Sequence, residues 1–290
     1  MNNKIGVHML VFTAGFSEKD LDYAIGTAKE IGYDYIELPL LNPYAIDVDL
    51  AKKALQSHNM QAVCLLGLSF DTDISSDDPD VRQNGQKLLW KALEVSAGLG
   101  AWYLGGVIYS AMAKYLKPAT EENRKYSAEF LAQLAEKAKS HGIKIGIEPV
   151  NRYESNLVNT GRQAIEFIKL SGSDNIFVHL DSYHMNIEEN DQSTPVHECQ
   201  DYLGYVHINE NHRGYLGSGS LDFTSLFHAL ADIKYTGPIA FESFSSAVIS
   251  EDFRSSLAIW RDLWTDSKDL ASRAKTFIDN YLYAAYRNKQ

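Results

Sequence analysis

IKIGIEPV, residues 143–150, is a short run of mostly β-branched and apolar residues in which a glutamate and a proline precede the final valine. Three similar runs follow it along the chain, NIFVHLD at 175–181, GYVHIN at 204–209 and GPIAFES at 237–243. Continuous apolar runs of this length are typical of strands that are buried on both faces, as they are in parallel sheets. We therefore predict four parallel strands in this half of the chain.

The first half of the chain repeats the pattern. Its strand-like runs are KIGVHMLV (4–11), YDYIEL (33–38), QAVCLLGL (61–68) and AWYLGGVI (101–108). Longer amphipathic segments lie between the runs and are predicted to be helices, among them 17–30, 80–99 and 120–140. Several runs are preceded by a glycine at the position where a helix commonly ends in a left-handed residue, namely Gly32, Gly100, Gly142, Gly204 and Gly237.

Eight alternating units of strand and helix favour an α/β fold of the closed (β/α)8 type, the TIM barrel. The alternative is an open doubly wound sheet, which alternates in the same way. No G-x-G-x-x-G follows the first run, so a dinucleotide site of the Rossmann type lacks support. Residues 251–290 are longer than one closing helix, and we predict two extra C-terminal helices that cap the barrel. Because the sequence has no linker and no repeat, we treat residues 1–290 as a single TIM-barrel domain.

The composition narrows the class of protein. A net charge of −11 and the lack of a cluster of Lys and Arg disfavour a nucleic-acid partner. No apolar run reaches about 18 residues, and the first residues lack the pattern of a signal peptide. We therefore expect a cytoplasmic protein with no membrane partner. The two cysteines, Cys64 and Cys199, indicate neither a disulfide framework nor a cysteine-based metal site.

The last four predicted strands each end in a residue that can bind a metal. These residues are Glu148, Asp181, His207 and Glu242. In a barrel the C-terminal ends of the strands converge on one face, where three carboxylates would repel each other unless a cation lay between them. Three oxygens and one nitrogen suit Mn2+, Co2+ or Mg2+ better than structural Zn2+. We predict one divalent metal per chain, with Mn2+ as the first choice, bound by these four side chains.

Two of these ligands are also predicted to be catalytic. Glu148 and Glu242 come from the fifth and eighth strands, so a substrate bound to the metal would lie between them. Two carboxylates on opposite faces of one carbon can act as base and acid, while the metal acts as a Lewis acid on the neighbouring carbonyl. This is the chemistry of proton transfer next to a ketone, and it leaves epimerisation and aldose–ketose isomerisation open.

Three longer strings are more specific than the four ligands. EPVNRYE (148–154), DSYHMNIEE (181–189) and HINENHRGYLGSG (207–219) resemble the D-tagatose/D-psicose 3-epimerase family. These ketose 3-epimerases belong to the sugar isomerase/epimerase TIM barrels of the xylose isomerase-like superfamily. The resemblance implies an isomerase that epimerises C3 of a ketose through a cis-enediolate. It also implies a small-molecule sugar substrate and a homo-oligomer, either a dimer or a tetramer.

The resemblance further implies which residues bind the sugar. Glu154, His184 and Arg213 would hydrogen-bond its O1/O2 end and place C3 between the two glutamates. The first strand departs from the family, which often has aromatic residues there. His8 is accordingly either a further substrate contact or a buried strand residue. The runs at 64–66 and 102–109 are expected to line the pocket for C4–C6 of the sugar.

Other functions stay open on the sequence alone. The same metal site could serve an aldose–ketose isomerase, or an epimerase of a keto-sugar derivative or a ketose phosphate. A nuclease of the endonuclease IV type would need further metal ligands and a basic surface, which the net charge of −11 disfavours. A catalytically silent sugar-binding barrel is the remaining alternative. No basic cluster indicates a phosphate site, which favours an unphosphorylated sugar of unspecified identity.

Overall fold

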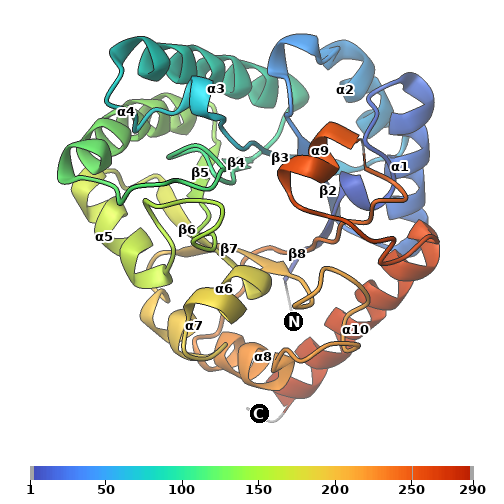
Figure 1. Cartoon of the computed structure of the whole chain (residues 1–290). Coiled ribbons are helices and arrows are strands. Elements are labelled where there is room, and N and C mark those ends of the chain that lie inside the picture. The colour runs from blue at the N-terminus through green and yellow to red at the C-terminus, as the bar shows by residue number, and fades with distance from the viewer. Residues whose placement is uncertain (1–2, 250, 288–290) are drawn as a thin grey trace.

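Parallel strands close into a barrel at the centre of the molecule (Figure 1). The computed structural model describes residues 3–249 and 251–287, and within them eight strands pair in chain order. The strands are β1 (Ile5–His8), β2 (Tyr35–Pro39), β3 (Gln61–Leu65), β4 (Tyr103–Gly105), β5 (Lys144–Ile147), β6 (Ile176–Asp181), β7 (Leu203–Ile208) and β8 (Ile239–Phe241). Because β1 pairs with β8, with Gly6 opposite Ala240, the ring is closed. The predicted TIM barrel is confirmed, and the open doubly wound sheet is excluded.

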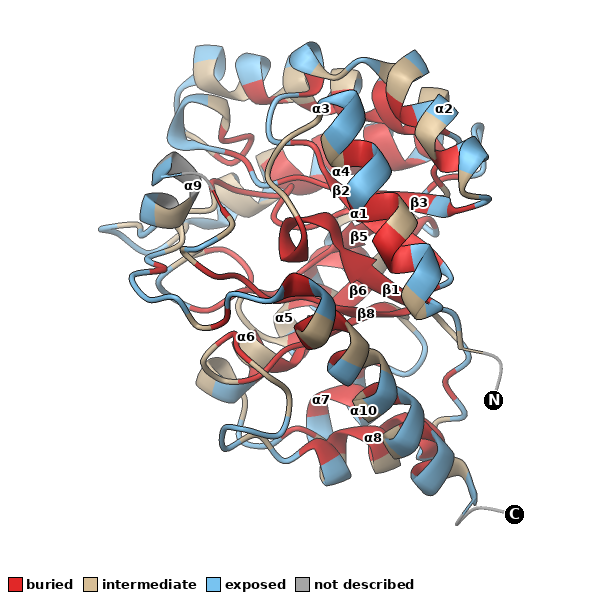
Figure 2. Ribbon diagram, turned by 90° about the vertical axis from the view of Figure 1, so that its right-hand side faces the viewer, coloured by how far each residue is buried: buried red, intermediate tan, exposed pale blue. Residues whose placement is uncertain are grey.

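Helices surround the barrel and shield its strands from water. They are α1 (Glu18–Ile31), α2 (Val48–Ser57), α3 (Pro79–Leu99), α4 (Glu121–Lys139), α5 (Gly161–Ser171), α6 (Ser182–Glu188), α7 (Thr194–Glu198), α8 (Phe223–Asp232), α9 (Glu251–Ser256) and α10 (Ser267–Arg287). Figure 2 shows buried strands inside helices whose outer faces are exposed. Ser17 and Thr120 cap α1 and α4 by accepting hydrogen bonds from backbone N–H groups of the first turn. No helix among the described residues is both long and apolar enough to cross a membrane.

Glycines end some helices as predicted, but not all of those proposed. Gly32 and Gly100 are left-handed, with φ of 97° and 72°, and directly follow α1 and α3. Gly204 was expected at a helix end but lies within β7, where a Cβ would sit 2.5 Å from the Cβ of Phe177. Gly237 likewise has no left-handed φ and packs against Tyr235. These two positions need glycine for close packing.

The C-terminal segment forms two helices, but they do not both cap the barrel. Helix α10 packs against α8 and α1 and thereby completes the outer ring. The predicted C-terminal helices are confirmed, but α10 lies in the outer ring instead of capping the barrel. The short α9 is followed by Leu257, which reaches the cavity described below.

Tyrosines fill the N-terminal half of the barrel interior. Tyr103 and Tyr205 stack with ring centroids 4.6 Å apart, and Tyr35 packs edge-on against Tyr205. A Cβ on Gly146 would lie 1.6 Å from the Tyr103 hydroxyl oxygen, so only glycine leaves room for that ring. The large side chains close one end of the barrel and leave its C-terminal end to polar residues.

Strand β1 is shorter than the predicted run 4–11. It ends at His8, and Met9–Val11 turns into a short 3-10 helix. The imidazole of His8 causes this ending in part, because its Nδ1 accepts a hydrogen bond from the backbone N–H of Leu10 at 3.2 Å. The turn places His8 at the mouth of the barrel.

Candidate active site

Four potential metal ligands meet at the C-terminal ends of β5 to β8. Glu148 directly follows β5, Asp181 ends β6, His207 lies in β7 and Glu242 directly follows β8. Nδ1 of His207 lies 3.5 Å from a carboxylate oxygen of Glu148, 3.5 Å from one of Asp181 and 3.7 Å from one of Glu242. The structure therefore brings together all four residues that the strand ends predicted.

The chemistry of this cluster fits a divalent cation. Nδ1 of His207 is buried and has no hydrogen-bond partner among the described residues, which is costly for a polar atom unless something else binds it. Nε2 of the same ring lies 2.9 Å from Oε1 of Glu37. In the neutral ring, the form that binds a metal, Glu37 holds the proton on Nε2 and leaves the Nδ1 lone pair facing the three carboxylates. Asp181, His207 and Glu242 offer ligand atoms that all lie within 4.8 Å of one another.

Burial and neighbouring charges affect the three carboxylates differently. Burial raises the pKa of Glu148 to about 8. Burial also acts to raise the pKa of Asp181, but positive charge, first that of Arg213, outweighs it and holds this pKa below its usual value. The pKa of Glu242 is lowered in the same way, because the charges of His207 and Arg213 outweigh burial. Without a bound cation, Glu148 is the carboxylate that carries a proton at neutral pH.

Arg213 supplies a fixed positive charge beside the cluster. Its Nη1 hydrogen-bonds the carboxylate of Glu242 and lies 3.4 Å from Oδ2 of Asp181. The guanidinium also lies over the rings of Tyr183 and Phe244, 3.9 and 5.1 Å from their centroids. Aromatic faces attract a cation and limit its movement. The arginine is therefore held with its charge directed at the carboxylates.

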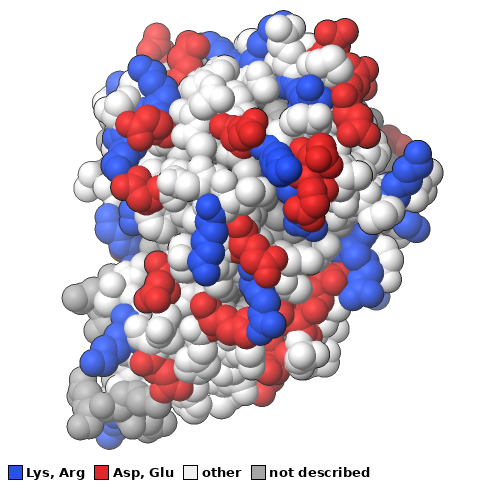
Figure 3. Space-filling model, turned by 90° about the vertical axis from the view of Figure 1, so that its left-hand side faces the viewer, with Lys and Arg blue, Asp and Glu red and all other residues white. Residues whose placement is uncertain are grey.

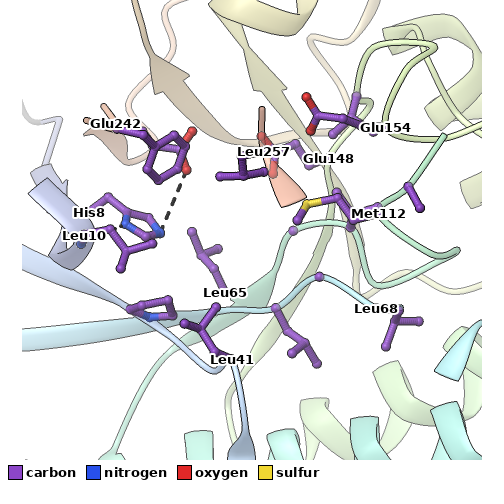
Figure 4. A pocket seen from close by; sticks show the side chains of 18 of the residues that line it. His8, Leu10, Leu41, Leu65, Leu68, Met112, Glu148, Glu154, Glu242 and Leu257 are labelled. Carbon is purple, nitrogen blue, oxygen red and sulfur yellow. Dashed lines mark hydrogen bonds and ion pairs between the residues drawn. The ribbon is translucent and has the colours of Figure 1, made fainter. Parts of the chain in front are cut away.

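A cavity of about 490 Å3 opens at the mouth of the barrel (Figure 4). Its wall contains all six residues predicted to be catalytic or to bind the sugar, namely Glu148, Glu242, Glu154, His184, Arg213 and His8. Glu148 and Glu242 lie on different sides of the cavity in Figure 4. Asp181 and His207 are buried and are not part of the wall. The volume is in the range of sites for small molecules.

His8 is both buried and part of the cavity wall. Since its Nδ1 accepts from Leu10, the neutral ring carries its proton on Nε2. Nε2 lies 3.9 Å from Oε1 of Glu242, a contact drawn as a dashed line in Figure 4. Burial lowers the pKa of His8, which favours the neutral ring. His8 can thus donate one hydrogen bond beside Glu242.

Asn151 orients two other residues of the wall. Its backbone N–H and its side-chain amide lie 3.1 and 3.0 Å from Nδ1 of His184, so this nitrogen accepts and Nε2 carries the ring proton. The same amide donates to Glu154 at 2.8 Å. Arg152, two positions before Glu154, pairs with Glu188 at 2.9 Å instead.

The remainder of the cavity wall is mainly apolar. It includes Leu10, Leu41, Leu65, Leu68, Met112 and Leu257. The described residues contribute no lysine, and no arginine besides Arg213, to this wall. The expected contribution of 64–66 and 102–109 is partly wrong. Cys64 packs in the core, and Trp102 packs against Tyr35 inside the barrel. The members of these runs that reach the wall are Leu65, Leu66, Gly106 and Val107.

Three buried polar residues of the site were not predicted. Glu37 holds His207, Asn209 donates to Oδ2 of Asp181 at 2.9 Å, and Asn151 orients His184. The sequence contains a pattern that could have indicated two of these residues. Glu37 stands inside an apolar strand run, and Asn209 lies two positions after His207, where the period of a strand returns to the same side. No comparable pattern marks Asn151.

The sequence and the fold both match known proteins. Residues 25–263 match the xylose isomerase-like TIM barrel family. A ketose 3-epimerase from Arthrobacter globiformis is 47% identical over 281 residues, which cover 97% of each chain. An L-ribulose 3-epimerase from Methylomonas sp. (strain DH-1) is 49% identical and covers 94% of this chain and 96% of that protein. The crystal structure of a D-allulose 3-epimerase from Methylomonas sp. in complex with D-allulose has a TM-score of 0.95 at 48% identity, with 97% of each chain covered.

Proposed function

Because the chain belongs to the ketose 3-epimerases of the xylose isomerase-like TIM barrel family, we propose that it inverts the configuration at C3 of a ketose in a metal-dependent reaction. The observation that carries the proposal is the pair Glu148 and Glu242, which enter one cavity from β5 and β8 beside a cluster that fits a cation. The protein is accordingly an isomerase of the carbohydrate epimerase class.

The two glutamates are proposed to move the proton. One carboxylate removes the proton from C3 on one face of the sugar, and the other returns a proton to the opposite face, so the configuration at C3 inverts. Because the wall places one carboxylate on each side, neither has to move around the sugar. A divalent metal held by Glu148, Asp181, His207 and Glu242 would act as a Lewis acid that polarises the C2 carbonyl and stabilises the charge that follows proton loss.

Four further wall residues are proposed to bind the sugar. Glu154, His184 and Arg213 are suited to the O1/O2 end, because they offer one acceptor and two donors close to the cation cluster. His8 is suited to donate from Nε2 to a hydroxyl or carbonyl oxygen beside Glu242. The apolar remainder of the wall leaves the far end of the sugar with few hydrogen bonds and with no site for a phosphate group.

The proposed cofactor is one Mn2+ per chain, with Co2+ or Mg2+ as replacements. The support is the donor set, since three carboxylate oxygens and one imidazole nitrogen suit these ions better than structural Zn2+. Removing the metal with a chelator and restoring each ion in turn, with turnover as the readout, tests this choice.

The reaction itself is tested with a panel of ketoses in D2O. Purified protein with Mn2+ should convert D-allulose (D-psicose) to D-fructose, and D-tagatose to D-sorbose, with deuterium incorporated at C3. L-ribulose belongs in the panel because a close relative carries its name. An aldose product with deuterium at C2 would instead indicate an aldose–ketose isomerase. No exchange on any ketose would contradict the proposal.

A nuclease function receives no support from the surface charge. Figure 3 shows acidic and basic side chains interspersed on the face that it presents, without a continuous basic tract. The chain as a whole carries a net charge of −11, which repels a phosphate backbone. We therefore propose a protein with a small sugar as its substrate and with neither nucleic acid nor membrane as a partner.

The assembly and location follow as further proposals. We propose a cytoplasmic homo-oligomer, a dimer or a tetramer, as expected from the resemblance to ketose 3-epimerases. Light scattering coupled to size-exclusion chromatography gives the mass of the assembly directly, and a mass of one chain would contradict this part of the proposal.

A further inference from the structure

The backbone of Arg213 adopts an unusual conformation. Its φ is 62°, in the left-handed region that favours glycine. A residue with a side chain keeps this costly conformation only when the surrounding structure holds it. The side chain in question reaches the carboxylates of Glu242 and Asp181, so whatever holds the backbone also sets where the guanidinium lies.

Two hydrogen bonds hold the backbone of Arg213. Its N–H donates to the carbonyl oxygen of Glu210 at 2.9 Å, within the same loop. Its carbonyl oxygen accepts from the hydroxyl of Ser243, which belongs to the segment after β8. Ser243 is fully buried, so water does not replace this bond.

Trp264 continues the chain of hydrogen bonds. Its Nε1–H donates to Oγ of Ser243 at 2.7 Å, and its own carbonyl accepts from Oγ of Ser245 at 2.6 Å. A serine hydroxyl has a single proton. Because Oγ of Ser243 accepts from the indole, its proton is directed to the carbonyl of Arg213, and the two bonds strengthen each other. Trp264 is buried and is not part of the cavity wall.

We propose that Ser243 and Trp264 are positioning residues for Arg213. They hold its carbonyl and thereby fix the loop that presents the guanidinium to the sugar. The inference rests on the proposed function and deepens it, because it names how the group that recognises the O1/O2 end is kept in place. Trp264, in the segment between α9 and α10, thus contributes to recognition without lining the cavity.

Two substitutions test this chain of hydrogen bonds, and each has a matched control. Ser243→Ala removes the donor to Arg213, and Ser96→Ala removes a buried serine hydroxyl that donates to a carbonyl within α3, away from the site. Trp264→Phe removes the indole N–H, and Trp260→Phe makes the same change at a side chain that is 69% exposed. We expect S243A to raise KM for D-allulose about tenfold and W264F about threefold, the range for loss of one hydrogen bond. The controls should leave KM unchanged.

An Arg213→Ala background separates positioning from general damage. Residues that act through Arg213 have nothing left to position there, so S243A and W264F should not raise KM further. An increase in KM of the same size in that background would overturn the proposal, because the two residues would then act without Arg213.

Hydrogen–deuterium exchange gives a readout that does not depend on turnover. Backbone amides in peptides covering residues 210–219 should exchange faster in S243A and W264F than in wild type, S96A or W260F. Unchanged exchange in both variants would overturn the proposal even in an active epimerase. A wild-type protein that turns over no ketose would contradict the proposed function, while faster exchange in S243A would still support the hydrogen-bond chain.

Discussion

At the scale of single residues, the orientation of the His207 imidazole determines how the site is arranged. Oε1 of Glu37 accepts from Nε2 of His207 at 2.9 Å and from the hydroxyl of Tyr205 at 2.5 Å. Both bonds lie in the fully buried interior of the barrel. A carboxylate there is tolerated because it is hydrogen-bonded to two donors. The result is an imidazole whose other nitrogen faces the three acidic ligands.

The first prediction concerns Glu37. Glu37→Gln keeps the size of the side chain but removes the charge that favours Nε2–H of His207. We expect Mn2+ to bind about 10–100-fold more weakly, the usual effect of losing such a partner of a ligand. Titration calorimetry on chelator-treated protein measures this. Glu166→Gln, at an exposed position on α5, is the control. An unchanged affinity in Glu37→Gln would show that Glu37 does not act through His207.

The second prediction concerns Glu242. Glu242→Gln should lower kcat by about 10²–10⁴-fold, because the amide cannot accept the proton. Metal binding should weaken as well, so the rate must be measured at saturating Mn2+. Circular dichroism should stay at the wild-type signal, since the barrel does not depend on this carboxylate. Incorporation of deuterium at C3 at the wild-type rate would remove Glu242 from the proton transfer.

The third prediction is the pH dependence of metal binding. Burial raises the pKa of Glu148 to about 8. Below this pH, Glu148 of the metal-free protein therefore carries a proton that the metal must displace. The pKa of His207 is raised as well, because neighbouring carboxylates, first that of Glu37, outweigh burial. Raising the pH removes these protons, and the affinity for Mn2+ should increase by up to about tenfold per pH unit for each displaced proton. Calorimetry in two buffers of different ionisation enthalpy counts the released protons. Affinity that is flat from pH 6 to 8 would contradict this.

At the scale of elements, β4 and β5 approach each other across a glycine. The ring of Tyr103 on β4 occupies the space that a side chain at Gly146 on β5 would need. The ring lies beneath the cluster, since Tyr103 stacks on Tyr205, which bonds Glu37. The packing of the barrel interior and the geometry of the ligands are thus connected by direct contacts.

The fourth prediction tests this packing. Gly146→Ala should lower the free energy of unfolding by about 1–3 kcal/mol, because the added methyl group overlaps the Tyr103 ring. Chemical denaturation measures the loss. The same change in a Tyr103→Leu background should cost less, since the ring is then absent. Equal losses in the two backgrounds would show that the ring is not what the methyl group meets.

The order of elements could be predicted because each strand and helix has a local pattern. The exact end of a strand could not be predicted in the same way. Strand β1 stops where Nδ1 of His8 accepts a hydrogen bond from the N–H of Leu10, and no periodic pattern in the sequence indicates this contact. The four ligands were accessible because each ends a strand of one barrel. The roles of Glu37 and Trp264 were not accessible, even though Glu37 stands out in its apolar run, since their partners His207 and Ser243 lie 170 and 21 positions away in the sequence. Only the folded chain shows such pairs.

At the scale of the whole molecule, the site draws on nearly the whole length of the chain. His8 comes from the first strand, Glu242 follows the last, and Leu257 lies in the C-terminal segment, yet all three line one cavity. A cation bound at the cluster would therefore tie together strands β5 to β8 and favour the closed ring over any open form. Ligands that bind only the folded state stabilise it.

The fifth prediction follows from this linkage. Mn2+ at about 100 times its Kd should stabilise the folded protein by about 2.7 kcal/mol, which corresponds to a rise in Tm of about 5 °C for a chain of this size. Differential scanning calorimetry with and without a chelator measures the shift. Asp181→Asn should lose most of it. A rise of the same size in Asp181→Asn would place the stabilising ion elsewhere.

The pairing of β1 with β8 has a consequence for the newly synthesised polypeptide. The first strand leaves the ribosome long before the last strand has been translated, yet His8 and Glu242 end 3.9 Å apart in the finished protein. Until the eighth strand has emerged, the ligand set lacks one carboxylate and the cavity lacks one wall. A nascent chain therefore cannot complete this site before its eighth strand has emerged.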